Sequence, residues 1–389
     1  MESARKSTTR VFLSAGEASG DLHGSHLVRA IRAKDPAVRI SCLGGPRLRQ
    51  AGAEVLVDNR QLSVVGLFEV VRHAKLIYQA YQKIKQHLLA TRPQVVVLID
   101  FPDFNLLLAR VARLVGSRVF YYISPQVWAW RKGRVRIIRR LVDEMAVILP
   151  FEADFYASCG MQVSYVGHPL LDVIESSPGA DRGPGQYRPK DAEFLLGLLP
   201  GSRLGEAHKF LPLLLDAAEK IRERMASVAF IIPVAISLDP ELIQAEADKR
   251  KLPLQVVSGD THAVLRACDL IITASGTVTL EAAILGTPMI IIYQVSNFTY
   301  HAGRHLIRVK QVGLPNLIAG RCVAPELLQQ DANAPAIAAR AVELLRHPEQ
   351  LQRQKEDLAG IRSRLGEPGV ASRVADLVLA QCAASTSGS

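Results

Sequence analysis

Short apolar runs of strand-like composition alternate with longer helical patterns along this chain, and this alternation constrains the fold more than any other feature. Strands and helices in this order are typical of a parallel sheet covered by helices. In the first half the apolar runs occupy residues 11–13, 38–43, 95–99, 119–123 and 145–149. In the second half they occupy residues 194–198, 228–232, 254–257, 270–273 and 289–292. The sequence therefore predicts two Rossmann-like, doubly wound α/β domains.

The domain boundary is expected in residues 175–190, which combine proline, glycine and charge without periodicity. A chain of 389 residues is also too long for one ordinary core. Helical patterns follow at 336–345, 350–365 and 370–380. We expect a first domain over residues 1–175, a second over 176–345, and terminal helices over 346–389 that pack back on the first domain before a disordered tail.

The charge balance favours anionic partners, because 47 Lys and Arg face 37 Asp and Glu, a net charge of +10. Phosphates, nucleic acid and acidic lipid all fit this charge. The five cysteines are scattered without a C-x-x-C pair, which favours a reducing cytosol over a disulfide framework or zinc ribbon. The polar start and the lack of an apolar run of roughly 20 residues predict no signal peptide or membrane span, so membrane contact is expected to be peripheral.

The first strand leads into SAGEASGDLHG at residues 14–24, a flexible turn that opens a helix. Such a turn offers backbone N–H groups to an anion. Gly16 allows a tight turn, and Glu17 and Asp21 place carboxylates near the helix entry. The competing interpretation is that Asp21 caps the helix that follows it.

The strand at 95–99 ends in IDFPDFN, and ligands bind at the carboxyl ends of strands in open α/β sheets. Asp100 is therefore placed as a general base, an effect worth about 10²- to 10⁴-fold in rate. The alternative is that Asp100 forms the turn. Asp103 is better explained as the N-cap of the next helix.

Two further strand-to-helix turns lie in the second half. In LPGSR, Gly201 and Ser202 precede a helix that starts near Glu206, and Arg203 adds a charge suited to a diphosphate. An ordinary glycine turn with a solvated arginine is the alternative.

The second of these turns is SGTVTLE, in which Ser275, Gly276 and Thr277 offer hydroxyls and amides to phosphate. Glu281 can accept hydrogen bonds from ribose hydroxyls. Helix-start chemistry alone could also explain this turn. Turns of the same kind in both halves suggest two domains that face one cleft.

Two regions predict contact with a membrane surface. The first is a helical apolar pattern with interleaved basic residues that starts at Leu67, Phe68 and Val71, although core packing explains the same pattern. The second places both tryptophans beside basic residues: Trp128, Trp130, Arg131 and Lys132. Nucleic acid is the rival ligand there, but no RNA-binding module is recognisable, so we expect no nucleic-acid partner.

No metal site is expected. His301 and His305 lie four apart without the glutamate of H-E-x-x-H, and the chain contains no Asp-x-Asp. Charge on a leaving group is then neutralised by amides and arginine.

Several strings taken together resemble one family. They are SAGEASGDLHG, GGPRLRQAG, IDFPDFN, YYISPQVWAW, LPFE, VGHPLLD, LPGSR, SGTVTLEAA and LPNLIAG. In that order they closely resemble the lipid-A-disaccharide synthase family, from about residue 11 to the terminal helices.

The resemblance implies an inverting glycosyltransferase of GT-B fold, in glycosyltransferase family 19. Its donor is UDP-2,3-diacylglucosamine and its acceptor is 2,3-diacylglucosamine 1-phosphate (lipid X). The products are the β(1→6)-linked lipid A disaccharide 1-phosphate and UDP, made without a metal or other cofactor. The expected location is peripheral, on the cytoplasmic face of the inner membrane, and the oligomeric state stays open, a homodimer included.

The resemblance also assigns roles to residues. Asp100 is expected as the base, with Glu17 as its acceptor-side partner or the alternative base. Arg203 and the neighbouring amides are expected to hold the diphosphate, and Asn316 in LPNLIAG to position substrate. The other hypotheses are a UDP-sugar 2-epimerase, a peptidoglycan glycosyltransferase, and a basic peripheral membrane or RNA-binding protein.

Overall fold

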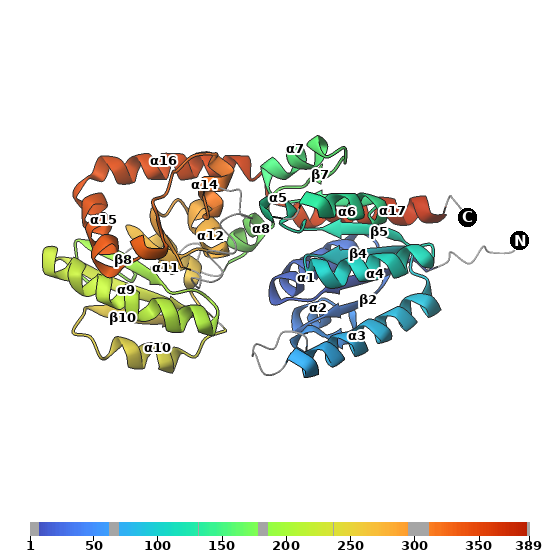
Figure 1. The fold of residues 1–389 in the computed structure, drawn as a ribbon, viewed down its shortest axis with the longest axis horizontal. Helices are drawn as coiled ribbons and strands as arrows, with labels where there is room; N and C mark the ends of the chain where they lie inside the picture. Colours follow the sequence, from blue (N-terminus) through green and yellow to red (C-terminus); the bar gives the residue numbers. More distant parts are fainter. Residues whose placement is uncertain are drawn as a thin grey trace, which may run out of the picture. The chain divides into compact units, whose positions relative to one another are not determined.

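The structure is a computed structural model, and it describes residues 8–61, 70–130, 132–177, 186–235, 237–294 and 311–386. The chain divides into two compact units, each with its own sheet (Figure 1). The first comprises Met1–Asp172 with Glu367–Ser389, and the second comprises Val173–Gly366.

The first unit is built on a seven-stranded parallel sheet in the order β3-β2-β1-β4-β5-β6-β7. The strands are β1 (Arg10–Ala15), β2 (Arg39–Gly44), β3 (Glu54–Asp58), β4 (Val95–Ile99), β5 (Arg118–Tyr122), β6 (Glu144–Val147) and β7 (Ser164–Tyr165). The central strand β1 pairs with β2 on one side and β4 on the other. The strand order therefore reverses between β1 and β4, which makes the carboxyl ends of these two strands the switch point of the sheet.

Helices cover this sheet. They are α1 (Ala18–Lys34), α2 (Pro46–Gln50), α3 (Val70–Thr91), α4 (Pro102–Leu114), α5 (Val127–Trp130), α6 (Val135–Leu141), α7 (Pro150–Ser158) and α17 (Val370–Thr386), and α8 (Leu170–Glu175) spans the unit boundary. The C-terminal helix α17 packs on α1, β4 and β5, as its red ribbon among N-terminal elements shows (Figure 1). All five residues of β4 are buried, as expected for a parallel sheet covered on both faces.

The second unit repeats the plan with a six-stranded sheet in the order β10-β9-β8-β11-β12-β13. Its strands are β8 (Phe194–Leu199), β9 (Val228–Val234), β10 (Leu254–Ser258), β11 (Leu270–Ala274), β12 (Met289–Tyr293) and β13 (Glu326–Leu328). The order reverses between β8 and β11, so the carboxyl ends of these strands form a second switch point.

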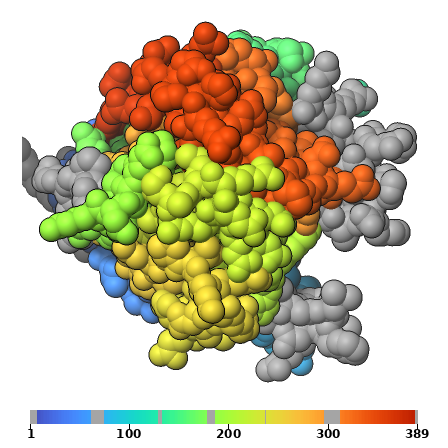
Figure 2. Space-filling view, turned by 90° about the vertical axis from the view of Figure 1, so that its left-hand side faces the viewer, coloured from blue at the N-terminus to red at the C-terminus, as the bar shows by residue number. Residues whose placement is uncertain are grey.

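The helices of the second unit are α9 (Leu204–Arg224), α10 (Pro240–Ala247), α11 (Thr261–Ala267), α12 (Thr277–Leu285), α14 (Leu314–Ala319), α15 (Ala334–Arg346) and α16 (Pro348–Arg364). Figure 2 shows one face of this unit, where the red-orange surface of the last helices adjoins the yellow-green surface of α9. Helices α9 and α15 pack together, and both bury apolar side chains in the core of the unit.

The fold class predicted from the sequence is confirmed, since all ten predicted strands lie in the two sheets. The prediction missed β3, β7 and β13, which are the edge strands of their sheets and are not continuous apolar runs, so packing rather than apolar content determines them. The structure also places the second crossing between the units at Gly366, not at residue 345. The reason is that α16 packs on α12, α14 and α15, so α17 alone returns to the first unit.

Helix α3 contains the apolar pattern that suggested a membrane surface. Tyr78 of this pattern is 60% exposed, but the part of the helix that follows faces inward: Ala80 is 6% exposed, and Ile84 and Leu88 are fully buried. Core packing therefore accounts for this part of the helix. Leu67, Phe68 and the side chain of Val71 lie outside the described residues, so their predicted lipid contact stays a prediction.

Candidate active site

Four of the polar turns singled out in the sequence lie at the two switch points. In the first unit, Gly16 and Glu17 follow β1, and Asp100 follows β4. In the second unit, the turn at 200–203 follows β8 and the turn at 275–277 follows β11. Each switch point thus gathers two turns from distant parts of the sequence, where open α/β sheets bind ligands.

In the first unit the turn after β1 fits closely against the turn after β4. A Cβ on Gly16 would lie 2.3 Å from Cδ1 of Phe101, so a larger residue would collide with this ring. Glu17 is the N-cap residue of α1 and is exposed. The absence of a side chain at residue 16 lets the two turns touch and brings the Glu17 carboxylate into the electrostatic surroundings of Asp100.

Asp100 begins an unusual stretch of backbone. Its φ is 45° and that of Phe101 is 47°, two consecutive left-handed residues that are not glycine. Residues held in this region cost about 1–3 kcal/mol each and persist only where their surroundings enforce them. The turn is therefore a strained feature that the rest of the unit has to hold in place.

The residues that hold this turn were not singled out from the sequence. The Asp100 carbonyl oxygen accepts hydrogen bonds from Nδ2 of Asn105, at 2.6 Å, and from the hydroxyl of Tyr121, at 2.7 Å. Asn105 also donates to the Ile99 carbonyl, at 3.1 Å, and its Oδ1 accepts from the Ser14 hydroxyl, at 2.6 Å. Asn105 belongs to the IDFPDFN string, but its role depends on a partner 91 residues away.

The Asp100 carboxyl has the electrostatics of a general base near neutrality. Its pKa is raised to about 6, first by burial and second by the negative charge of Glu17. A base works best when its pKa lies near the working pH. Asp103, in contrast, is not the N-cap of α4 as expected; Phe101 occupies that position, and the exposed Asp103 carboxylate forms an ion pair with Arg134.

Asp21 has a structural role instead of the expected contact with substrate. It is 4% exposed, and its carboxylate accepts hydrogen bonds from the backbone N–H groups of Gly45, at 2.7 Å, and of Arg47 and Leu48, both at 3.1 Å. These groups belong to the start of α2. Asp21 therefore caps α2, and it cannot cap the helix that follows it because it already lies inside α1.

In the second unit the turn after β8 carries an exposed cation. Gly201 has a φ of 106°, and a Cβ there would lie 2.6 Å from Oε2 of Glu206. Arg203 is the N-cap residue of α9, and its side chain is 79% exposed. Its one ion-pair contact in the described part of the chain is a 3.5 Å approach to Glu206. The guanidinium is thus free to turn toward an anion at the helix N-terminus.

The turn after β11 places a second helix N-terminus beside the first. Gly276 is the N-cap residue of α12 and Thr277 is its first residue. The Ser275 hydroxyl lies 3.4 Å from the Val312 carbonyl oxygen, a long hydrogen bond. Backbone N–H groups at the start of α12 are available to a phosphate, as the sequence predicts.

Glu281 has a partner that sequence reasoning missed. Its Oε2 lies 3.2 Å from Nε2 of His262, and Nδ1 of this histidine lies 2.9 Å from the Ser177 hydroxyl. A carboxylate accepts hydrogen bonds, so Nε2 of His262 donates to Glu281, and Nδ1 shares a second hydrogen bond with the Ser177 hydroxyl. This chain orients one oxygen of Glu281 and leaves Oε1 without a hydrogen bond among the described residues.

Asn316 is not available to position substrate by direct contact. It is fully buried, its Nδ2 donates to the Ala324 carbonyl and to Glu326, and its Oδ1 accepts from the N–H groups of Val323 and Ala324. Glu326 in turn accepts from the N–H groups of residues 312 and 313. Asn316 therefore holds the loops around α14 in shape.

Of the second region predicted to meet lipid, the structure describes one side chain that bears on the question. Trp128 is partly buried and packs edge-on against Phe151, with ring centroids 4.9 Å apart. Packing within the first unit accounts for this tryptophan. Arg131 and the side chains of Trp130 and Lys132 lie outside the described residues, as do His301 and His305.

The described residues hold neither a metal-binding cluster nor a membrane-spanning helix. They contain no group of three or more His, Cys, Asp or Glu side chains arranged to hold a metal ion. None of their helices combines the length and the hydropathy that crossing a bilayer requires.

Two open parallel α/β units, each with polar turns at its switch point, define a protein of the GT-B class of fold. A sequence model of the lipid-A-disaccharide synthetase family matches residues 11–379. The chain belongs to this family, so the resemblance predicted from its motifs is confirmed.

Curated relatives agree with the family assignment, and solved structures agree with the fold. Lipid-A-disaccharide synthase of Geobacter sulfurreducens is 46% identical over 95% of this chain and 96% of its own length. The synthase of Nitrosococcus oceani is 43% identical over 95% of each chain. The crystal structure of UDP-GlcNAc 2-epimerase from Neisseria meningitidis bound to UDP-GlcNAc has a TM-score of 0.66 at 11% identity, covering 96% of this chain and all (100%) of that one. The crystal structure of Acinetobacter baumannii MurG has a TM-score of 0.59 at 16% identity, covering 96% of this chain and 99% of that one. The two solved structures are similar in fold alone.

Proposed function

We propose that this protein is a glycosyltransferase that condenses UDP-2,3-diacylglucosamine with 2,3-diacylglucosamine 1-phosphate. The products are the β(1→6)-linked lipid A disaccharide 1-phosphate and UDP. The observation that carries the proposal is membership of the family over residues 11–379, together with the polar turns at both switch points. The enzyme acts at the cytoplasmic face of the inner membrane as a peripheral protein.

The first unit supplies the base. Inversion at C1 requires the acceptor 6-hydroxyl to attack from the face opposite UDP, and its proton then passes to the Asp100 carboxylate. Burial and Glu17 raise the pKa of Asp100 to about 6, so the carboxylate is ionised at pH 7 yet more basic than an exposed aspartate. The Asn105 and Tyr121 hydrogen bonds hold the turn that carries it.

The second unit binds the donor and stabilises the leaving group. The diphosphate lies against the N-termini of α9 and α12, with Arg203 closing on it. The Glu281 carboxylate, oriented by His262, accepts from the ribose hydroxyls through Oε1. As the C1–O bond breaks, the charge that develops on UDP meets amides and a guanidinium that are already in place.

The deciding experiment mixes the purified protein with both lipid substrates and measures released UDP. We expect release only when both lipids are present, and at an unchanged rate in a chelator, because the amides and Arg203 neutralise the charge by themselves. Release with the UDP-sugar alone indicates a hydrolase or epimerase. Strong inhibition by the chelator that Mg²⁺ reverses contradicts the metal-free mechanism.

The donor site is tested with Arg203→Ala. The loss of a charge-assisted hydrogen bond should weaken UDP binding by about tenfold or more. Arg353→Ala is the matched control, because Arg353 is an exposed arginine on α16 in the same unit. If Arg203→Ala binds UDP with unchanged affinity, Arg203 does not contact the diphosphate.

A further inference from the structure

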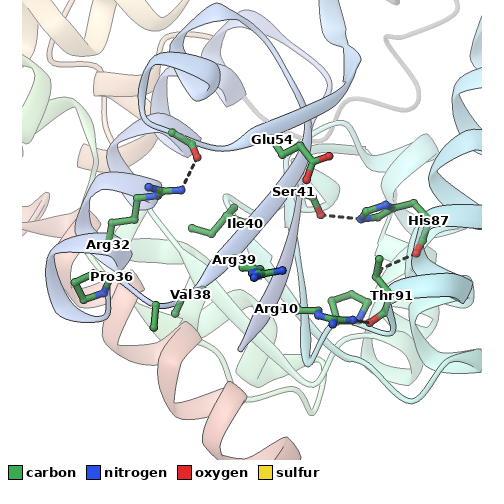
Figure 3. Close-up of a pocket in the computed structure, with 13 residues that line it drawn as sticks. Arg10, Arg32, Pro36, Val38, Arg39, Ile40, Ser41, Glu54, His87 and Thr91 are labelled. Carbon is green, nitrogen blue, oxygen red and sulfur yellow. Dashed lines mark hydrogen bonds between the residues drawn. The ribbon is translucent and has the colours of Figure 1, made fainter. Parts of the chain in front are cut away.

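One cavity of the first unit lies away from the turns that carry Asp100 and Glu17. Its volume is about 590 Å³, within the roughly 300–1,000 Å³ of small-molecule sites. Arg10 and Arg39 line it, and they are the first residues of β1 and β2. The cavity therefore lies at the amino edge of the sheet, whereas the candidate base lies at the carboxyl edge. We call it the amino-edge cavity (Figure 3).

Three guanidinium groups line this cavity, those of Arg10, Arg32 and Arg39. The Arg10 side chain donates to the Thr91 carbonyl, at 3.1 Å, and the Arg32 side chain donates to the Gly52 carbonyl, at 2.5 Å. These contacts orient two of the arginines and leave most of their five N–H donors unused.

The charge in the cavity is not balanced. In the described part of the chain, none of these three arginines forms an ion pair, and the Arg39 side chain makes no hydrogen bond. The lining contains a single carboxylate, Glu54, and it lies near His87, whose pKa it tends to raise. Burial is the larger influence and lowers the pKa of His87, so the histidine is neutral at pH 7. Three positive groups thus share the cavity with one negative group.

The side of the cavity where Arg10 contacts the Thr91 carbonyl also offers polar groups other than arginine. Nε2 of His87 lies 2.9 Å from the Ser41 hydroxyl, and both lie beside Glu54 in the view of Figure 3. This side can receive hydroxyl groups of a ligand. The arginines, with planar forks of N–H donors, match the oxygens of a phosphate.

We propose that the amino-edge cavity binds a phosphate group through Arg10, Arg32 and Arg39, as a second anion site separate from the one assigned to the donor nucleotide. A dianion offsets the net positive charge of the lining, which favours phosphate over a neutral ligand. The phosphate comes either from a small soluble molecule or from the headgroup of an anionic phospholipid.

The test uses the full-length protein saturated with UDP, so that added phosphate cannot report on the donor site. Binding of inorganic phosphate is followed by ³¹P NMR titration. Arg39→Gln should weaken this binding by about tenfold, the effect of one charge-assisted hydrogen bond, and Arg10→Gln with Arg39→Gln should abolish it. Arg110→Gln is the matched control, because it removes an exposed arginine of the same unit, on α4, and should change affinity less than twofold.

Vesicles distinguish the two sources of phosphate. If binding to phosphatidylglycerol vesicles, relative to phosphatidylcholine vesicles, falls in Arg39→Gln but not in Arg110→Gln, the ligand is a lipid headgroup. If only the titration with free phosphate responds to Arg39→Gln, the ligand is soluble. The proposal is overturned when neither probe binds the UDP-saturated protein, or when Arg39→Gln and Arg110→Gln affect both probes equally.

Discussion

Asp100 combines a strained backbone with an elevated pKa, and each property has its own cause. The strain comes from consecutive left-handed residues that Asn105 and Tyr121 hold in place. The pKa of about 6 comes from burial and from the charge of Glu17. Perturbed carboxyl groups of this kind are concentrated at functional sites. At the residue scale, the pair of Asp100 and Glu17 is therefore where the chemistry is best tested.

The pH dependence of kcat/KM should identify which carboxylate is the base. With Asp100 as the base, kcat/KM falls about tenfold per pH unit below pH 6, because protonation removes the acceptor of the proton. Asp100→Asn should lower kcat by at least about 10²-fold and leave UDP affinity unchanged.

Glu17→Gln supplies the comparison for this prediction. It removes a negative charge near Asp100, so the acid limb of the profile should move to lower pH while activity persists. If Glu17→Gln abolishes turnover and Asp100→Asn retains it, the two roles are reversed.

Asn105 should matter for both stability and turnover. Asn105→Ala leaves two carbonyls at the end of β4 with fewer donors, and the free energy of unfolding should fall by about 1–3 kcal/mol. Relaxation of the turn should also lower kcat without changing the Kd of UDP. Denaturant unfolding and steady-state kinetics measure the two effects.

Asn333→Ala is the control for Asn105→Ala. The Asn333 side chain also forms a hydrogen bond with the backbone, but it caps α15 in the second unit. It should cost about 1 kcal/mol and leave kcat unchanged. An equal loss of kcat in both variants indicates that Asn105 acts through general stability only.

At the scale of a single element, α7 depends on a buried carboxyl. Glu152 is 1% exposed, and its carboxylate accepts hydrogen bonds from the N–H groups of Ile148, at 3.2 Å, and Leu149, at 2.9 Å. These contacts cap the helix start. Burial nevertheless dominates and raises the pKa of Glu152 to about 7, so the ionised form is less stable inside the protein than in the unfolded chain.

This pKa predicts how stability changes with pH. Because the folded-state pKa exceeds the ordinary 4.5, the folded protein binds the proton more tightly, and stability is lost as pH rises from about 4.5 to 7. The loss from this one group is about 3 kcal/mol. Glu152→Gln should remove that part of the pH dependence, as measured by denaturant unfolding at pH 4.5 and pH 8. A variant with the same pH profile as the parent protein contradicts the assignment.

At the scale of the whole molecule, the first unit is completed by the end of the chain. The Asp172 carboxylate accepts hydrogen bonds from the N–H groups of Gly369, at 2.6 Å, and Ala371, at 3.2 Å, at the start of α17. Helix α17 then packs on α1, β4 and β5, and β4 leads directly into Asp100. A C-terminal element thus supports the strand that carries the candidate base.

Asp172→Ala should weaken the attachment of α17 to the first unit. Loss of the cap should cost about 1–2 kcal/mol and raise the hydrogen exchange of α17 amides, while UDP binding by the second unit is unchanged. The control is Asp376→Ala, which breaks the ion pair between Lys34 and Asp376. Because the Asp376 side chain is 63% exposed, this variant should lower the free energy of unfolding by less than about 1 kcal/mol. Unchanged exchange in α17 after Asp172→Ala shows that packing alone holds the helix.

The sequence by itself determined the local features. Alternating apolar runs were sufficient for ten strands and for two doubly wound domains, because fully buried parallel strands have to be apolar along their whole length. The motifs identified the family. The turns after β1, β4, β8 and β11 were found because their glycines and charged side chains stand out against the apolar strands that they follow.

Tertiary structure decided the features that depend on distant partners. Asp21 and Asn316 resemble site residues in sequence, but the fold surrounds them with backbone groups that use their hydrogen-bonding capacity. Asn105 and His262 have hydrogen-bond partners 91 and 19 residues away, Ser14 and Glu281, which no local pattern reveals. Packing also decides that α16 belongs to the second unit and α17 to the first. The physical reason is that local propensity depends on neighbours along the chain, whereas burial and hydrogen-bond satisfaction depend on neighbours in space.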